Sequence, residues 1–82
     1  MKDYIVCLKL TNDVRIMTRV SLVGIKAWES PEEKVCDFFT PDSIHRCYRE
    51  INCYDGELAE EQTHNQAVNL NHIVEIKFIK IE

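Results

Sequence analysis

Residue types that bind metals or act as nucleophiles are present in this chain, but their spacing fits no known site. The 82 residues include four cysteines and three histidines, and such side chains are the usual ligands of tetrahedral zinc. However, no C-x-x-C pair occurs, and the gaps among these residues match no zinc motif. We therefore predict no bound metal, with buried thiols and surface imidazoles instead. The ligand types considered are Cys36, His45, Cys47, Cys53, His64 and His72.

Catalytic motifs are also missing. The sequence contains no nucleophile elbow, no H-E-x-x-H and no glycine-rich phosphate loop, and its two glycines, Gly24 and Gly56, stand alone. Paired carboxylates such as Glu32-Glu33 read as exposed rather than poised in a pocket. We predict a non-enzymatic protein with no catalytic residues and no cofactor.

An acidic segment is the clearest surface signature. Asp55, Glu57, Glu60 and Glu61 follow one another with no Lys or Arg between them. A charge run of this kind is most often a solvated loop. Its functional interpretation is a docking surface for a basic partner, because complementary charge speeds encounter and sets register.

A basic strand face offers a different interpretation. Arg15, Met17 and Arg19 alternate with apolar residues, so they project from the same side of a predicted strand. Such a face could bind nucleic acid or a small ligand. The charge balance argues against it, because residues 1–41 hold six basic and six acidic side chains.

Length and composition predict one domain over residues 1–82. The net charge is −4, and all of the acidic surplus falls in residues 42–82, which disfavours nucleic acid and anionic membranes as main partners. No apolar run approaches the roughly 20 residues that cross a bilayer, and no leader pattern follows Met1. We expect a cytoplasmic protein with reduced thiols.

The first half of the chain predicts a hairpin and a helix. Residues 4–10 and 14–22 alternate apolar and polar side chains and are separated by Thr11-Asn12-Asp13, a short run of turn formers. The first strand is apolar on both faces and is expected to be covered on both sides. Ser30-Pro31-Glu32-Glu33 then predicts a helix start, with Ser30 as the cap.

The middle of the chain is open to two interpretations. Ile44, Cys47, Tyr48 and Ile51 follow helical spacing after Thr40-Pro41-Asp42, which favours a second helix. The rival interpretation is a turn between strands 34–39 and 44–51. Residues 57–66 read as a loop or short exposed helix, and residues 67–70 as a brief strand.

The last ten residues predict a strand whose pattern slips. Val74, Ile76 and Phe78 share one face, whereas Ile79 and Ile81 fall on the other. Such a strand must bulge, or its second face must be covered. Ile79 and Ile81 are therefore candidates for core or for a dimer interface.

Together these signals predict a small α+β domain of ββααββ order, with an antiparallel sheet and one or two short helices on one face. In size and charge alone the chain is similar to small acidic proteins of phages and mobile elements that bind a larger protein. We expect an inhibitor or regulator that docks on a larger, locally basic, nucleic-acid-handling protein. A homodimer through the last strand or an open sheet edge is a further prediction.

Overall fold

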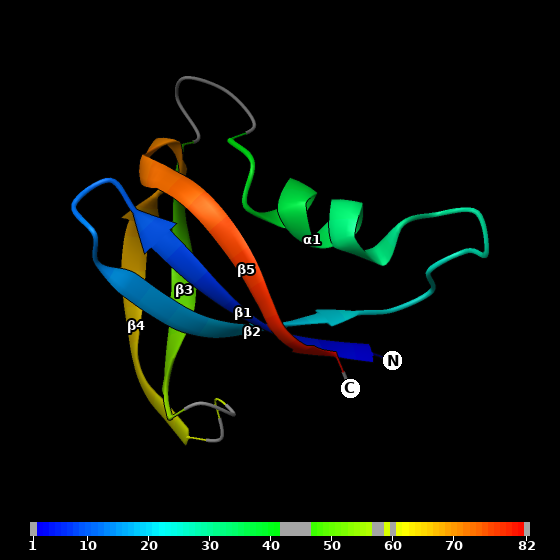
Figure 1. The fold of residues 1–82 in the computed structure, drawn as a ribbon, viewed down its shortest axis with the longest axis horizontal. Coiled ribbons are helices and arrows are strands. Elements are labelled where there is room, and N and C mark those ends of the chain that lie inside the picture. Colours follow the sequence, from blue (N-terminus) through cyan, green and yellow to red (C-terminus); the bar gives the residue numbers. More distant parts are fainter. Residues whose placement is uncertain (1, 42–46, 57–58, 60, 82) are drawn as a thin grey trace.

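The computed structural model describes residues 2–41, 47–56, 59 and 61–81. Five antiparallel strands form one sheet in the order β4-β3-β2-β1-β5, with one α-helix against it (Figure 1). The elements in chain order are β1 (Lys2–Leu10), β2 (Arg15–Leu22), α1 (Pro31–Phe38), β3 (Tyr48–Asp55), β4 (Glu61–Asn69), the 3-10 helix η1 (Leu70–His72) and β5 (Ile73–Ile81).

The predicted first hairpin is confirmed. β1 and β2 pair from Lys2 with Leu22 to Lys9 with Arg15. Asp13 takes a positive φ of 63° in the connection, and the Leu10 amide donates to the Val14 carbonyl at 2.9 Å to close it. The chain therefore reverses at the predicted turn formers.

The predicted start of helix α1 is also confirmed. The Ser30 hydroxyl accepts a hydrogen bond from the Glu33 amide at 3.4 Å, and Pro31 opens the first turn. Val35 and Phe39 are both buried and hold the helix against the sheet, because they lie four residues apart on one helical face.

The predicted second helix is wrong where the structure describes it. Residues 48–51 belong to strand β3, whereas residues 42–46 lie outside the described residues. Ile51 and Cys53 are buried and Asn52 between them is exposed, so the period of two prevails over the helical spacing. The rival interpretation is correct for 48–51 but wrong for 34–39, because residues 34–38 are helical and Phe39 caps the helix. The ββααββ order is thus replaced by strand, strand, helix and three further strands.

The prediction of a loop or helix at 57–66 is wrong for residues 61–66. They form most of β4, which pairs with β3 from Tyr48 with Asn69 to Asp55 with Glu61. Every residue from Glu61 to Ala67 is exposed. Because residues 61–67 have no buried face, this part of the strand shows no apolar alternation in its sequence, and its polar composition resembles that of a loop. Val68, near the end of β4, is buried, within the brief strand predicted at residues 67–70.

The slipped pattern of the last strand is explained by two bulges. The register between β1 and β5 shifts between Lys9 and Leu10 and again between Ile5 and Val6. As a result, four core-facing residues of β1 lie opposite apolar residues of β5, and two residues of β5 have no register partner on β1. The partners are Leu10 with Ile73, Leu8 with Ile76, Val6 with Phe78 and Tyr4 with Ile81; the residues without a register partner are Val74 and Ile79.

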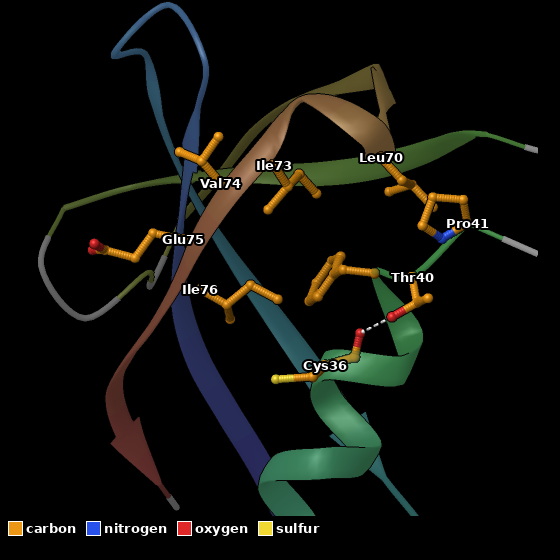
Figure 2. Close-up of a pocket in the computed structure, with 9 residues that line it drawn as sticks. Cys36, Thr40, Pro41, Leu70, Ile73, Val74, Glu75 and Ile76 are labelled. Carbon is orange, nitrogen blue, oxygen red and sulfur yellow. Dashed lines mark hydrogen bonds between the residues drawn. The ribbon is translucent and has the colours of Figure 1, made fainter.

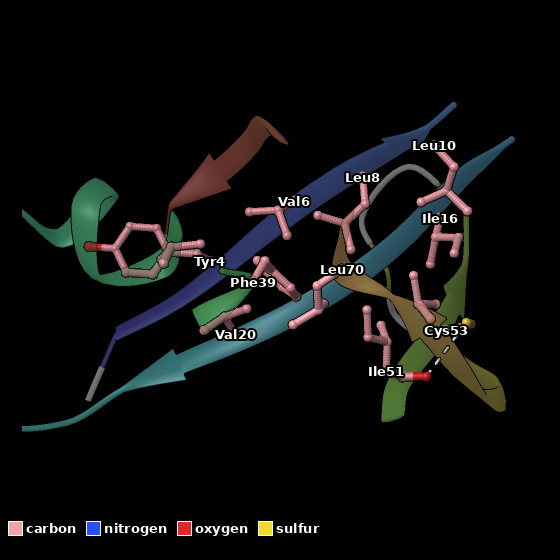
Figure 3. Close-up of a cluster of buried hydrophobic side chains, with 12 residues drawn as sticks. Tyr4, Val6, Leu8, Leu10, Ile16, Val20, Phe39, Ile51, Cys53 and Leu70 are labelled. Carbon is pink, nitrogen blue, oxygen red and sulfur yellow. Dashed lines mark hydrogen bonds between the residues drawn. The ribbon is translucent and has the colours of Figure 1, made fainter. Parts of the chain in front are cut away.

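The core lies on one side of the β1–β2 hairpin. Figure 3 shows side chains from β1, β2 and β3 meeting Phe39 and Leu70 on this side. On the opposite side Ile5 is also fully buried, whereas Cys7 and Lys9 are half-buried, so the predicted second covered face of β1 is found at Ile5. Its register neighbour Arg19 is half-buried, and an arginine stem can cover apolar surface in this way.

The join between β2 and β3 is narrow. Among the described residues, only Met17 and Tyr54 form a registered pair between these strands. The sheet therefore consists of a three-stranded part, β5-β1-β2, and a two-stranded ribbon, β3–β4, whose Ile51, Cys53 and Val68 contribute to the same core. In the described part of the chain, no helix has the length and apolar character needed to span a membrane.

Candidate functional site

The acidic segment lies at one end of the β3–β4 ribbon. Asp55 and Glu61 are direct cross-strand partners and both are exposed. One Asp55 carboxylate oxygen accepts a hydrogen bond from the Gly56 amide at 3.0 Å. Within the described residues, no Lys or Arg lies within ion-pair distance of either carboxylate. We refer to Asp55 and Glu61 as the acidic hairpin end; Glu57 and Glu60 lie outside the described residues.

A buried alanine anchors this end of the ribbon to the sheet. Ala59 is fully buried and has a φ of 48°, a conformation that few residues other than glycine adopt. Its amide donates to the Gly56 carbonyl at 3.2 Å, and its carbonyl accepts a hydrogen bond from Arg19 Nε at 2.8 Å. The connection between β3 and β4 is therefore tied to β2.

The predicted basic face is only partly available. Arg19 Nη1 lies 4.0 Å from an Asp3 carboxylate oxygen, in addition to its bond to Ala59, so this side chain has a structural role. Arg15 is exposed and Met17 half-buried. These two residues line a hollow of about 240 Å³ together with Tyr54, Thr63 and His64.

A larger groove separates α1 from β5. It has a volume of about 380 Å³, within the lower part of the range for ligand sites. In Figure 2, Ile73 and Ile76 point into the groove toward Thr40, whereas Val74 and Glu75 point away from it. Cys36, Phe39, Pro41 and Leu70 complete its lining.

One of the two candidate interface residues of β5, Ile79, is more exposed than the core residues. Ile79 is 41% exposed and Val74 is 58% exposed, because each is the extra residue of a bulge. The backbone of Ile81 pairs with Tyr4. The exposure of Ile79 favours the interface interpretation over the core interpretation for that residue.

The thiols and imidazoles do not gather into a site. No three His, Cys, Asp or Glu residues of the described ranges lie close enough together to hold a metal ion. Cys7, Cys36 and Cys47 are partly buried free thiols, and Cys53 is a buried one. Burial raises the pKa of the Cys53 thiol, so this residue stays protonated and packs as a small apolar side chain.

Sequence reasoning missed three features of these surfaces. The hollow beside Arg15 includes Tyr54 from β3 and Thr63 and His64 from β4, which the sequence did not predict to lie beside that strand face. Val74 was grouped with Ile76 and Phe78 on one strand face, but it is a bulge residue and is 58% exposed. The groove beside α1 could not be anticipated, because it depends on how the helix sits against β5.

Three comparisons with known proteins give no match from which a function could be transferred. No family model, no curated protein and no solved structure matches the chain.

Proposed function

We propose that the chain is a non-enzymatic protein-binding module whose acidic hairpin end docks on a larger, locally basic protein. The observation that carries this proposal is the pairing of Asp55 with Glu61 directly across β3 and β4. Like charges in this position destabilise an antiparallel pair. A basic partner surface would convert that repulsion into attraction, and the complementary charge would speed encounter.

The anchoring of the ribbon supports the same proposal. Because Arg19 holds the Ala59 carbonyl at 2.8 Å, the connection that follows Asp55 is tied to the sheet before any partner arrives. A surface ordered in advance loses less conformational entropy on binding. On this proposal the chain acts as an inhibitor or regulator, by covering a basic surface that its partner would otherwise use for nucleic acid.

The test is an affinity capture from nuclease-treated host lysate, with matched charge reversals. The bait is the wild-type chain, the Asp55→Lys/Glu61→Lys double variant, or a Glu50→Lys control. Glu50 is also an exposed carboxylate on β3, but its cross-strand partner is Ala67. Washes at low and moderate salt separate electrostatic from apolar retention.

We expect one stoichiometric protein to be retained by the wild-type and control baits and lost with the double variant. Titration with that purified protein should then give a dissociation constant at least about tenfold weaker for the double variant than for the control. Equal retention by all three baits, or no protein retained by any, would refute docking through this end.

A second candidate function is supported by the hollow beside Arg15. A cation, a thioether and an aromatic ring lie together there, as Arg15, Met17 and Tyr54. A base stacked on Tyr54 with its phosphate near Arg15 would use general features of single-strand recognition. At about 240 Å³ the hollow suits one base or a similarly small ligand. Titration with a fluorescent single-stranded oligonucleotide tests it: binding that falls with salt and is lost in Arg15→Ala would support it, and no binding would exclude it.

A further inference from the structure

The outer edge of β5 has no strand partner among the described residues, and its residues are arranged symmetrically. In this part of the chain β5 pairs with β1 and forms one end of the sheet. From Ile73 to Ile79 the sequence reads two apolar residues, an acid, an apolar residue, a base and two apolar residues. The centre of this pattern is Ile76, with Glu75 on one side and Lys77 on the other.

This symmetry determines what happens when two β5 edges meet. Two identical antiparallel strands related by a two-fold axis perpendicular to their sheet place one residue opposite its own copy. With Ile76 at the axis, Glu75 lies opposite Lys77 of the second copy, and Lys77 lies opposite Glu75 of the second copy. Both cross-strand pairs are then attractive.

The neighbouring registers lack this complementarity. An axis at Glu75 brings two carboxylates together, and an axis at Lys77 brings two ammonium groups together. Either arrangement puts like charges directly opposite, which is unfavourable. Of these three central registers, only the one at Ile76 pairs acid with base.

The charges are available for such pairing. Glu75 and Lys77 are both exposed. Lys9, the register neighbour of Glu75 on β1, instead lies 3.6 Å from Asp13. Within the described residues, neither Glu75 nor Lys77 takes part in an ion pair.

The register at Ile76 also covers the exposed apolar residues of β5. Val74 would face Phe78 of the second copy, and Ile79 would face Ile73 of the second copy. Val74 and Ile79 are the two bulge residues, 58% and 41% exposed, so the pairing would bury the apolar surface that the bulges leave outside the core. The three central pairs lie between the bulges, where β5 is regular.

The opposite edge of the sheet provides a contrast. β4 exposes Gln62, Thr63, His64, Asn65 and Gln66 in succession, and the Gln62 side chain already donates to the Asn65 side chain at 2.7 Å. This edge lacks the exposed apolar residues and the charge symmetry of β5. The apolar content and the charge symmetry therefore single out β5.

We infer that two copies of this chain associate through antiparallel pairing of their β5 edges, with Ile76 at the two-fold axis and reciprocal Glu75–Lys77 pairs on either side of it. The result is a continuous sheet with five strands from each copy. The groove between α1 and β5 lies beside the new interface in each copy. The acidic hairpin end remains free, because β4 is the other edge of the sheet.

The test uses charge reversal of the full chain in sedimentation equilibrium, with a reducing agent present to keep the thiols free. We expect the mass to rise from that of a 9.6 kDa chain toward twice that value between about 5 µM and about 1 mM, the range of weak specific association. Glu75→Lys alone and Lys77→Glu alone should each weaken self-association at least about tenfold, because each turns two attractive pairs into two repulsive ones.

Complementary variants then test the register. An equimolar mixture of the Glu75→Lys chain and the Lys77→Glu chain should form a heterodimer, and the Glu75→Lys/Lys77→Glu double variant should regain the homodimer. Circular dichroism of each variant confirms that the fold is retained. Glu50→Lys is the control for net charge and should leave the mass unchanged.

Three outcomes would overturn the inference. They are a monomer at all concentrations, a dimer insensitive to both reversals, and a dimer that the complementary mixture fails to restore. A chain that captures a foreign protein through β5 while staying monomeric would also overturn it. None of these outcomes bears on the acidic hairpin end, whose test uses different residues.

Discussion

Replacement of Val35 by alanine measures how firmly α1 is packed on the sheet. Val35 is the fully buried residue of this helix. The substitution removes two carbon atoms, and each buried carbon contributes about 0.8 kcal/mol to the free energy of unfolding. The transfer contribution is therefore about 1.6 kcal/mol, and the cavity left behind raises the loss to about 2–3 kcal/mol.

A loss of this size is large for the chain. Domains of this length have free energies of unfolding on the order of 4–12 kcal/mol, and each kcal/mol corresponds to roughly 4–8 °C in Tm. We therefore expect a loss of 2 kcal/mol in Val35→Ala to lower Tm by about 8–16 °C. Urea unfolding followed by circular dichroism would give the free energy directly.

The chain supplies its own matched control. Val23 is 77% exposed, so Val23→Ala removes the same atoms from a residue that is already in water and should change the free energy of unfolding by less than about 0.5 kcal/mol. If the two variants are equally stable, α1 is not held by Val35, and the packing described for the helix is wrong.

Three further predictions concern single groups. Ser30→Ala should lower the free energy of unfolding by about 1 kcal/mol, because the Glu33 amide loses its acceptor. Ser30→Asp should retain most of the stability that the cap provides. An alanine variant as stable as the wild type would contradict the cap. Burial raises the pKa of the Cys53 thiol. The contribution of this thiol to the free energy of unfolding should therefore be constant below the unfolded-state pKa near 8.5 and be lost as pH rises through the folded-state pKa. Between pH 7 and pH 10 the free energy of unfolding should fall less in Cys53→Ala than in wild type. Glu61→Gln should stabilise the chain by roughly 0.5 kcal/mol, because it removes the like-charge pair with Asp55; a loss of stability in thermal melts would show that these carboxylates do not repel.

Local signals predicted the elements that depend on local chemistry. The turn at Thr11-Asn12-Asp13 and the cap at Ser30 act within a few residues, so composition and spacing identify them. The slip in the apolar pattern of the last strand correctly predicted a bulge. The number of bulges, however, depends on which residues of β1 lie opposite, and the strand itself does not encode that register.

The errors lie where tertiary context decides between two patterns. Ile44, Cys47, Tyr48 and Ile51 fit a helix, yet residues 48–51 pair with β4 because Ile51 and Cys53 complete the core. Helical spacing over a single turn is weak evidence beside a strand partner. In β4 the prediction of a brief strand at 67–70 is confirmed for residues 67–69, whereas the exposed residues 61–66 had no apolar pattern to detect.

The candidate sites were harder to predict than the fold. The acidic segment could be read from composition, but the pairing of Asp55 with Glu61 required the β3–β4 register. Arg19 was grouped with Arg15 because they share a strand face. In the structure the two arginines differ, since Arg19 bonds to the Ala59 carbonyl, which comes from a segment far along the chain.

The narrow join between β2 and β3 determines how mechanical load would pass through the molecule. With Met17 and Tyr54 as the registered pair between these strands in the described residues, few ladder hydrogen bonds connect the ribbon to the rest of the sheet. A pull on the acidic hairpin end is instead transmitted by the Arg19–Ala59 tether and by the packing of Ile51, Cys53 and Val68. Side-chain packing yields to small tilts more readily than a hydrogen-bonded ladder does. The ribbon is therefore held to the three-stranded part mainly by side-chain contacts and by the Arg19–Ala59 hydrogen bond, so a load on its acidic end would act on these contacts first.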